Sequence, residues 1–394
     1  MTEALSLKDA QKLVLLAQKL PPTKQSGSAQ AATLSAIEHL GYIQIDTISV
    51  VHRAHHHTLW NRNPRYIPEH LDQLVADKKV FEYWSHAAAY LPMCDYRFSL
   101  PRKLAIADRD QKHWYVRDEK LMQAVKQRIT DEGPLMAKDF GDSKKATGHW
   151  KSKPSKRALE SLYMQGDLMI PARRSFHKVY DLTERVLPSG TNTSIPSAQE
   201  HIRFLISQYL QANGIGQASE IAYLLKNVKP LIASTLQDMV DSGELIKLNV
   251  QDQDYFATAD ALESLRQPLA RSHLKILSPF DNLLIQRKRM QTLFQFDYLI
   301  ECYVPEAKRK FGYFCLPILW QGVLSARMDC KTDRKTGTLH IHLLDIESTV
   351  KDLEAFTLAL SKELRRFMQF NACNSLHIHK APKVVEHLLS LSFQ

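Results

Sequence analysis

Gln44 and Asp46 stand two residues apart in the short stretch IQIDT. In a β-strand, side chains two apart share a face, and the rise of about 3.3 Å per residue would place these two roughly 7 Å apart. Ile43 and Ile45 would then face the core. A carboxylate can activate water or stabilise a developing cation, and an amide can hold that water. The spacing alone also fits an exposed polar strand face, or an aspartate that caps the following turn.

A basic, histidine-rich stretch, HRAHHHTLWNRNPRY, begins at His52. Its three adjacent histidines, the first of which is His55, do not form the i, i+4 pair of a helical metal site, and no Cys/Asp cluster follows. We therefore predict no metal. The arginines, including Arg53 and Arg62, together with two aromatic residues favour contact with phosphate.

The stretch FEYWSHAAAYLP is dense in aromatic residues. Such a segment is most often part of a core. Tyr83, Trp84 or His86 could instead line a pocket for a base or a sugar.

Basic side chains cluster before a predicted helix and on the hairpin expected after it. Backbone N–H groups at a helix N-terminus already favour phosphate, and a basic helix followed by a basic hairpin is typical of contact with the DNA backbone. The residues concerned are Lys151, Lys153, Lys156, Arg157, Arg173 and Arg174.

Two further basic runs look turn-like. They could contact phosphates or keep a sheet edge soluble. Their candidate residues are Arg287, Arg289, Lys308 and Arg309.

The overall charge agrees with a polyanionic partner. The 394 residues carry a formal net charge of +10. Residues 141–190 hold ten Lys/Arg against five Asp/Glu, and residues 271–340 hold twelve against six, so these two segments contain the whole excess. Such a distribution resembles a footprint for an anion more than a uniformly solvated surface.

The cysteines and the N-terminus indicate a compartment. The chain has five cysteines and no CxxC pair, which favours reduced thiols in a cytoplasmic protein. The first residues do not resemble a signal peptide, and no stretch approaches the roughly 20 apolar residues of a membrane span. We expect a cytoplasmic protein without membrane contact.

Helix signals come early in the chain. Ser6 is a predicted N-cap, and a second helix is expected over 29–40. A weak repeat then places a helix, a glycine and a strand in succession. Its three copies are LSAIEHLGYI, LESLYMQGDLM and LQDMVDSGELI. Predicted helices precede the last two copies and predicted hairpins follow them, which favours tandem winged helices over unrelated junctions.

The C-terminal part is predicted to be a sheet with one long amphipathic helix. The expected strands are LFQFDYLIECYVP, FGYFCLPIL, GVLSARMDCK and TLHIHLL, and the helix is TVKDLEAFTLALSKELRRFMQF. The predicted fold class is α+β, with three tandem winged-helix units. The predicted domains are 1–115, 116–192 and 193–264 for the winged helices, and 265–394 for the β-rich part.

Several enzyme classes lack their sequence signatures here. There is no P-loop, no GxGxxG in context, no GxSxG and no HExxH. Nucleotide hydrolysis, dinucleotide redox chemistry, serine hydrolysis and zinc proteolysis are therefore disfavoured.

The chain resembles the bacterial winged-helix DNA glycosylases that unhook interstrand crosslinks, the AlkZ/AlkX (YcaQ-like) family. The similarity covers essentially the whole chain. The runs that carry it are IQIDT, EYWSH, VYDLTERVLP, LSPFD, ECYVPEAKRKFGYFCLP and ARMDCKTDRKTG. The Gln-apolar-Asp form resembles the AlkX branch. Two places depart from the pattern: Ala87 stands where an acid is usual, and Asn282 stands where proline is usual, with Gln286-Arg287 replacing a later Asp-Arg.

This resemblance implies three winged helices forming a basic concave surface, and a monofunctional glycosylase that removes N7-alkylated purines and unhooks nitrogen-mustard-type crosslinks. It implies that Gln44 and Asp46 are the catalytic pair. Asp46 would stabilise an oxocarbenium-like sugar and activate water, while Gln44 would hold the water or the sugar. No lysine near the pair suggests a Schiff base, so strand cleavage is not expected.

The expected partner is double-stranded DNA with alkylated or crosslinked purines. A crosslinked base cannot swing out freely, so the enzyme would approach the lesion within the duplex, through the minor groove. We expect a monomer without a cofactor. Two other classes stay open: a non-enzymatic winged-helix DNA-binding transcription regulator, for which Gln44 and Asp46 would be dispensable, and an interaction scaffold with negligible DNA affinity.

Overall fold

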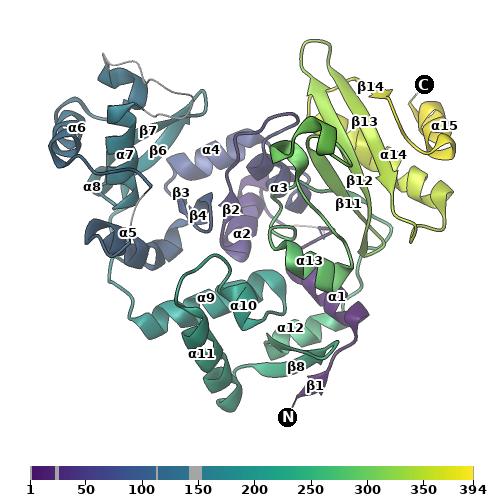
Figure 1. Cartoon of the computed structure of the whole chain (residues 1–394), viewed down its shortest axis with the longest axis horizontal. Coiled ribbons are helices and arrows are strands. Elements are labelled where there is room, and N and C mark those ends of the chain that lie inside the picture. The colour runs from purple at the N-terminus through teal and green to yellow at the C-terminus, as the bar shows by residue number, and fades with distance from the viewer. Residues whose placement is uncertain (1, 23–25, 112–113, 142–152, 394) are drawn as a thin grey trace.

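The computed structural model describes residues 2–22, 26–111, 114–141 and 153–393. Within these ranges the chain has both helices and mainly antiparallel sheets, in agreement with the predicted α+β class. The strands form three three-stranded sheets and one five-stranded sheet. Figure 1 shows the five-stranded sheet at one side of the molecule, with the smaller helix–sheet units beside and below it.

The first unit surrounds the IQIDT stretch. Ser28 caps α2, and Gly41 ends it in the left-handed conformation that glycine favours (φ 77°). The sheet order is β2-β4-β3. The elements are α2 (Ala29–Leu40), β2 (Ile43–Gln44), α3 (Ala54–Arg62), α4 (Pro68–Ala76), β3 (Val80–Trp84) and β4 (Ala88–Pro92). After them come η1 (Met93–Ser99) and α5 (Leu100–Ala107).

The second unit repeats the same succession of helix, short strand, two helical segments and hairpin. Its sheet order, β5-β7-β6, is the same in pattern. The elements are α6 (Glu119–Glu132), β5 (Leu135–Met136), η2 (Ala137–Phe140), α7 (Pro154–Met164), β6 (Leu168–Arg174), β7 (His177–Leu182) and α8 (Thr183–Val186).

The third unit has the same order again, with a single bridge from Gly216 to Phe256 in the place of the first strand. Its elements are α9 (Ala198–Asn213), α10 (Ala218–Ile221), α11 (Lys229–Asp241), β8 (Ile246–Val250) and β9 (Gln253–Ala257). Helix, strand, two helices and a hairpin is the order of a winged helix, and we interpret the three units in this way.

The repeat in the sequence is only partly reproduced in space. The copies that end at Gly166 and Gly243 both lead from a helix into a hairpin. The copy that ends at Gly41 does not, because β2 is the first strand of its sheet. In the first unit the matching junction joins α4 to β3, and Lys78 takes the left-handed position there (φ 56°). Because a lysine occupies the position that is a glycine in the repeat, the repeat pattern does not predict this junction.

The C-terminal part is the five-stranded sheet β10-β11-β12-β13-β14, with α14 and α15 packed together beside it. Its elements are β10 (Lys275–Ile276), α13 (Arg287–Phe294), η4 (Glu301–Tyr303), η5 (Glu306–Lys308), β11 (Cys315–Trp320), β12 (Val323–Asp333), β13 (Thr338–Ile346), α14 (Leu353–Phe370), β14 (Ser375–Ile378) and α15 (Lys383–Ser392). Before them lie α12 (Ala259–Glu263) and η3 (Ser264–Arg266).

One predicted strand of this part is wrong. LFQFDYLIECYVP begins in helix α13, and the rest joins no described sheet. Phe296, Tyr298 and Ile300 are buried while the residues between them are exposed. Alternate burial therefore reflects an extended segment lying on the core, without the hydrogen-bonding partner that a strand needs.

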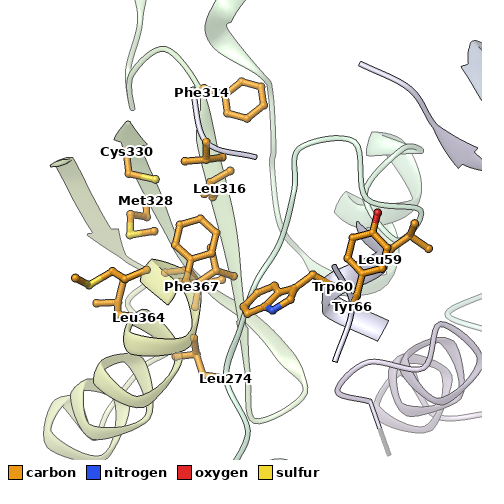
Figure 2. Packing of buried hydrophobic residues seen from close by; sticks show 14 of the residues in the cluster. Leu59, Trp60, Tyr66, Leu274, Phe314, Leu316, Met328, Cys330, Leu364 and Phe367 are labelled. Atoms are coloured by element: carbon orange, nitrogen blue, oxygen red, sulfur yellow. The ribbon is translucent and has the colours of Figure 1, made fainter. Parts of the chain in front are cut away.

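The largest core joins the first unit to the C-terminal sheet. Figure 2 shows Trp60 of α3 beside Phe367 of α14. The Trp60 ring stacks on Phe370 with centroids 4.9 Å apart. These aromatic contacts attach the unit that carries IQIDT to a large sheet, which limits its movement.

The N-terminal segment contacts the first unit through Ala17 and Gln18 but packs mainly against the third unit and the C-terminal part. Ser6 caps α1 (Leu7–Ala17), as predicted. However, β1 (Glu3–Ala4) pairs in parallel with β8 of the third unit, and Leu13 lies in a core with residues of that unit and of the C-terminal part. The cores thus cross the expected domain limits, and the division at 115, 192 and 264 stays a proposal.

Two further expectations concern cysteines and membranes. All five cysteines are free thiols, and three of them are buried. Within the described ranges, no helix has the length and apolar character needed to cross a membrane.

Candidate active site

The IQIDT stretch has the alternation that its sequence predicts. Ile43 and Ile45 are buried, whereas Gln44 and Asp46 are half-buried and face the other side. The strand pairs with β4, and the Ile45 N–H continues the ladder by donating to the carbonyl of Ala88 (2.8 Å). Pairing with β4 therefore fixes the direction of the polar face.

Asp46 combines the two roles that its position allows. Its Oδ1 accepts a hydrogen bond from the Ile48 N–H at 2.7 Å, so the carboxylate does cap a turn. Its Oδ2 accepts no hydrogen bond from any residue that the structure describes. The turn thus fixes the carboxylate and leaves one oxygen for another partner.

The surroundings of Asp46 affect its protonation. Burial raises the pKa of the carboxyl above its ordinary value, while the Ile48 N–H and the charge of Arg53 act in the opposite direction. The η4 segment of the C-terminal part lies near Asp46. Burial first, and then the charge of Asp46, raise the pKa of the Cys302 thiol. The Tyr303 side chain nearby is 77% exposed.

Gln44 is oriented by a residue 42 positions away. His86 Nε2 lies 2.9 Å from Gln44 Oε1. Burial lowers the pKa of His86 to about 4, so the imidazole is neutral near pH 7. A neutral ring that donates from Nε2 to the amide oxygen leaves the amide N–H groups of Gln44 free to donate elsewhere. Tyr42 meets the His86 ring edge-on at 5.1 Å.

The loop that carries Asp46 is held by the C-terminal part. The Thr332 N–H donates to the Val50 carbonyl (2.8 Å), and Arg334 donates to the Ser49 carbonyl (2.9 Å). The His52 N–H donates to Asn371 Oδ1 (2.8 Å). Reasoning from local sequence missed these supports, although Thr332 and Arg334 lie in the ARMDCKTDRKTG run.

A second support comes from the hairpin of the second unit. The ring of Phe176 lies between the guanidinium groups of Arg53 (3.9 Å) and Arg173 (4.4 Å). Arg173 also makes two hydrogen bonds to the Glu82 carboxylate, at 2.7 and 2.8 Å. Arg173 was expected to contact DNA phosphate, but this ion pair occupies it. It joins the first and second units instead.

Four other basic or polar residues are buried. His55 and Tyr83 are each 1% exposed, and the Tyr83 hydroxyl donates to the Met164 carbonyl. Arg289 is 4% exposed and paired with Glu220 (2.6 Å), inside a helix rather than a turn. Arg62 is fully buried. In this conformation His55, Arg62 and Arg289 present no exposed side chain to phosphate. Tyr83, which was predicted to line a pocket for a base or a sugar, belongs to the lining of a cavity.

The remaining basic residues face solvent. Lys153 is the N-cap residue of α7, and Arg309 is half-buried with its Nε donating to the Val304 carbonyl (2.9 Å). Lys151 lies outside the described residues. The exposed positions are Lys153, Lys156, Arg157, Arg174, Arg287 and Lys308.

Across the residues that the structure describes, no three His, Cys, Asp or Glu side chains are grouped so as to hold an ion. The adjacent histidines point to different neighbours. His56 contacts Tyr66, and His57 contacts the Ile276 carbonyl.

Comparison with known proteins gives the class of the molecule. The family model "DNA glycosylase AlkZ-like" matches residues 37–370, so the chain belongs to the AlkZ-like DNA glycosylase family. The protein is thus an enzyme that acts on DNA. The fold is similar to that of Streptomyces sahachiroi DNA glycosylase AlkZ, with a TM-score of 0.66 and 16% identity. That match covers 95% of this chain and 99% of the other.

Proposed function

We propose that this glycosylase hydrolyses the N-glycosidic bond of N7-alkylated purines and unhooks nitrogen-mustard-type interstrand crosslinks. The observation that supports the proposal is the Asp46 carboxylate, fixed by a turn at one oxygen and free at the other, beside an oriented Gln44. A non-enzymatic regulator would need neither feature.

Asp46 would act on the sugar. Cleavage of the glycosidic bond passes through an oxocarbenium-like state, and a fixed carboxylate stabilises that cation without first reorganising. The half-buried position strengthens the interaction, since less water screens it. The free Oδ2 would also take a proton from the attacking water. The pKa of Asp46 is raised, but Arg53 restrains the rise and favours the ionised form.

Gln44 would hold the water or a sugar oxygen. Because His86 occupies the amide oxygen, Gln44 presents N–H donors to an oxygen of the substrate or of the nucleophile. His86 would act as a positioning residue, since it touches Gln44 rather than the reacting atoms.

The leaving group needs little help. A guanine alkylated at N7 already carries a positive charge, so it departs as a neutral base without a general acid. One carboxylate can then suffice, where ordinary glycosidases use two. Arg53 is the cation whose charge acts on Asp46, and an arginine cannot form the Schiff base of a strand-cleaving enzyme. We therefore propose a monofunctional reaction.

DNA would be bound by the exposed basic residues, Lys153, Lys156, Arg157, Arg174, Arg287 and Lys308. Phosphate contacts of this kind depend on salt but not on base sequence. We propose a monomer that holds duplex DNA across these positions.

The test is base release from duplex DNA with a single N7-methylguanine, together with unhooking of a nitrogen-mustard crosslink. Wild type and Asp46→Asn are compared, with duplex binding measured for both. Asp260→Asn changes an exposed carboxylate on α12 and serves as a matched control. We expect release by wild type and the control, and at least a hundredfold loss in Asp46→Asn with binding kept.

Two results would contradict the proposal. Tight binding with no release from either lesion would exclude the proposed substrates and favour a regulator. Equal release by Asp46→Asn would remove the carboxylate from the mechanism.

A further inference from the structure

A cavity of about 260 Å³ lies directly behind the Gln44–His86 pair. It is bordered by the first unit, by helices α9 and α10 of the third unit, and by the segment that leads into α13. His86 and Tyr42 belong to its lining. The mechanism proposed above makes no use of this space.

Several aromatic side chains belong to the lining of the cavity. Tyr42, Trp84, Phe204 and Tyr223 all line it. The guanidinium of Arg102 lies over the Trp84 ring, 5.6 Å from the ring centroid. The ring centroids of His86 and Tyr223 are 6.1 Å apart. Aromatic faces of this kind bind planar rings by stacking.

One wall presents a hydrogen-bond acceptor with a fixed direction. Asn282 is 8% exposed, and its Nδ2 donates to the Tyr42 carbonyl (2.9 Å). This bond determines which end of the amide faces inward. The Oδ1 that remains is buried and has no hydrogen-bond partner in the described part of the chain. A buried acceptor left without a partner is costly, and a ligand with an N–H group would satisfy it.

A donor also stands without a partner. Arg102 Nε is buried and makes no hydrogen bond to the described residues. Arg289 in the lining is paired with Glu220, and burial lowers the pKa of His86 to about 4, so neither of these residues adds a free positive charge. Asp95 contributes a carboxyl group whose pKa is raised by burial. The lining thus combines aromatic side chains with polar ones, and among these Asn282 Oδ1 and Arg102 Nε are buried without a hydrogen-bond partner in the described part of the chain.

We propose that this cavity binds a purine base, with Asn282 Oδ1 accepting from an N–H at the edge of the base and the ring of Tyr223 stacking on it. A purine is smaller than the ligands of typical drug-sized pockets and suits a cavity just below that range. The identity of the base as an N7-alkylpurine rests on the proposed function.

The test is equilibrium binding of free 7-methylguanine to the whole chain, by calorimetry and by quenching of tryptophan fluorescence. We expect saturable binding with one site per chain. Asn282→Leu removes the acceptor and should weaken binding at least fivefold. Tyr223→Ala, at a position 37% exposed, removes a stacking face and should weaken it similarly. Tyr313→Ala, at 40% exposure and outside the cavity lining, is the matched control and should bind normally.

Competition then separates a released base from a base still attached to DNA. If 7-methylguanine displaces lesion-bearing duplex more readily than undamaged duplex, the lesion base itself occupies the cavity. If it displaces neither, the cavity takes the base after release.

Failure of this proposal can be told apart from failure of the proposed function. Absence of saturable binding up to the solubility of the base, or equal binding by all three variants, would overturn the cavity assignment even if base release from DNA is observed. Binding that is lost in Asn282→Leu, in a protein that releases no base, would keep the purine site and exclude the proposed substrates.

Discussion

The ion pair between Arg62 and Asp281 joins helix α3 to the LSPFD segment, and neither side chain is exposed to solvent. Asp281→Asn keeps the shape of the side chain but removes its charge. We expect the free energy of unfolding to fall by about 3–5 kcal/mol, because the buried guanidinium would lose the carboxylate with which it is paired.

The magnitude follows from the contacts of the pair. Two nitrogens of Arg62 bind the carboxylate, and the bond from Nη2 to Oδ1 is 2.7 Å long. The guanidinium also donates to neutral acceptors, among them Gln18 Oε1 at 2.9 Å. A neutral oxygen does not replace the charge of the lost carboxylate. In the double variant Arg62→Met/Asp281→Asn both charges are absent, so its cost should be about 2 kcal/mol or more below the sum of the costs of Arg62→Met and Asp281→Asn.

Urea unfolding of wild type, both single variants and the double variant measures these free energies. Arg65→Met, at an exposed arginine three residues along, should stay within about 0.5 kcal/mol of wild type. A cost below about 1 kcal/mol for Asp281→Asn, or single costs that simply add, would refute the reasoning.

Three further predictions concern titration and orientation. Burial lowers the pKa of Lys103 to about 7. Between pH 7 and 10.5 the unfolded chain therefore binds more protons than the folded chain. The free energy of unfolding should then rise with pH across that window by up to about 5 kcal/mol. Lys103→Met should abolish the rise in urea titrations at pH 7 and pH 10. Arg53→Met should move the acid limb of kcat/KM to higher pH, because Arg53 lowers the pKa of Asp46; an unmoved limb would assign the titration to another group. His86→Phe removes the donor to Gln44 and should lower kcat about two- to tenfold with duplex binding kept; unchanged single-turnover rates would show that Gln44 needs no such support.

Local sequence determined the features whose causes lie within a few residues. The alternation in IQIDT predicted which side chains are buried, because a strand has a period of two. Ser6 was readable as a helix start, since a cap bonds only two or three positions away. The hairpins of the second and third units followed from the same kind of local pattern.

Tertiary structure decided which charged and polar residues are available to a substrate. Arg62, Arg173 and Arg289 look like phosphate ligands in sequence, yet each has an acid partner brought to it by the fold from at least 69 residues away. His86 reaches Gln44 through the pairing of β2 with β4. The sequence specifies which residues are charged and where they stand along the chain. The partner and the burial of each charge depend on which distant surfaces meet, because the hydrophobic effect that brings these surfaces together has no local spacing.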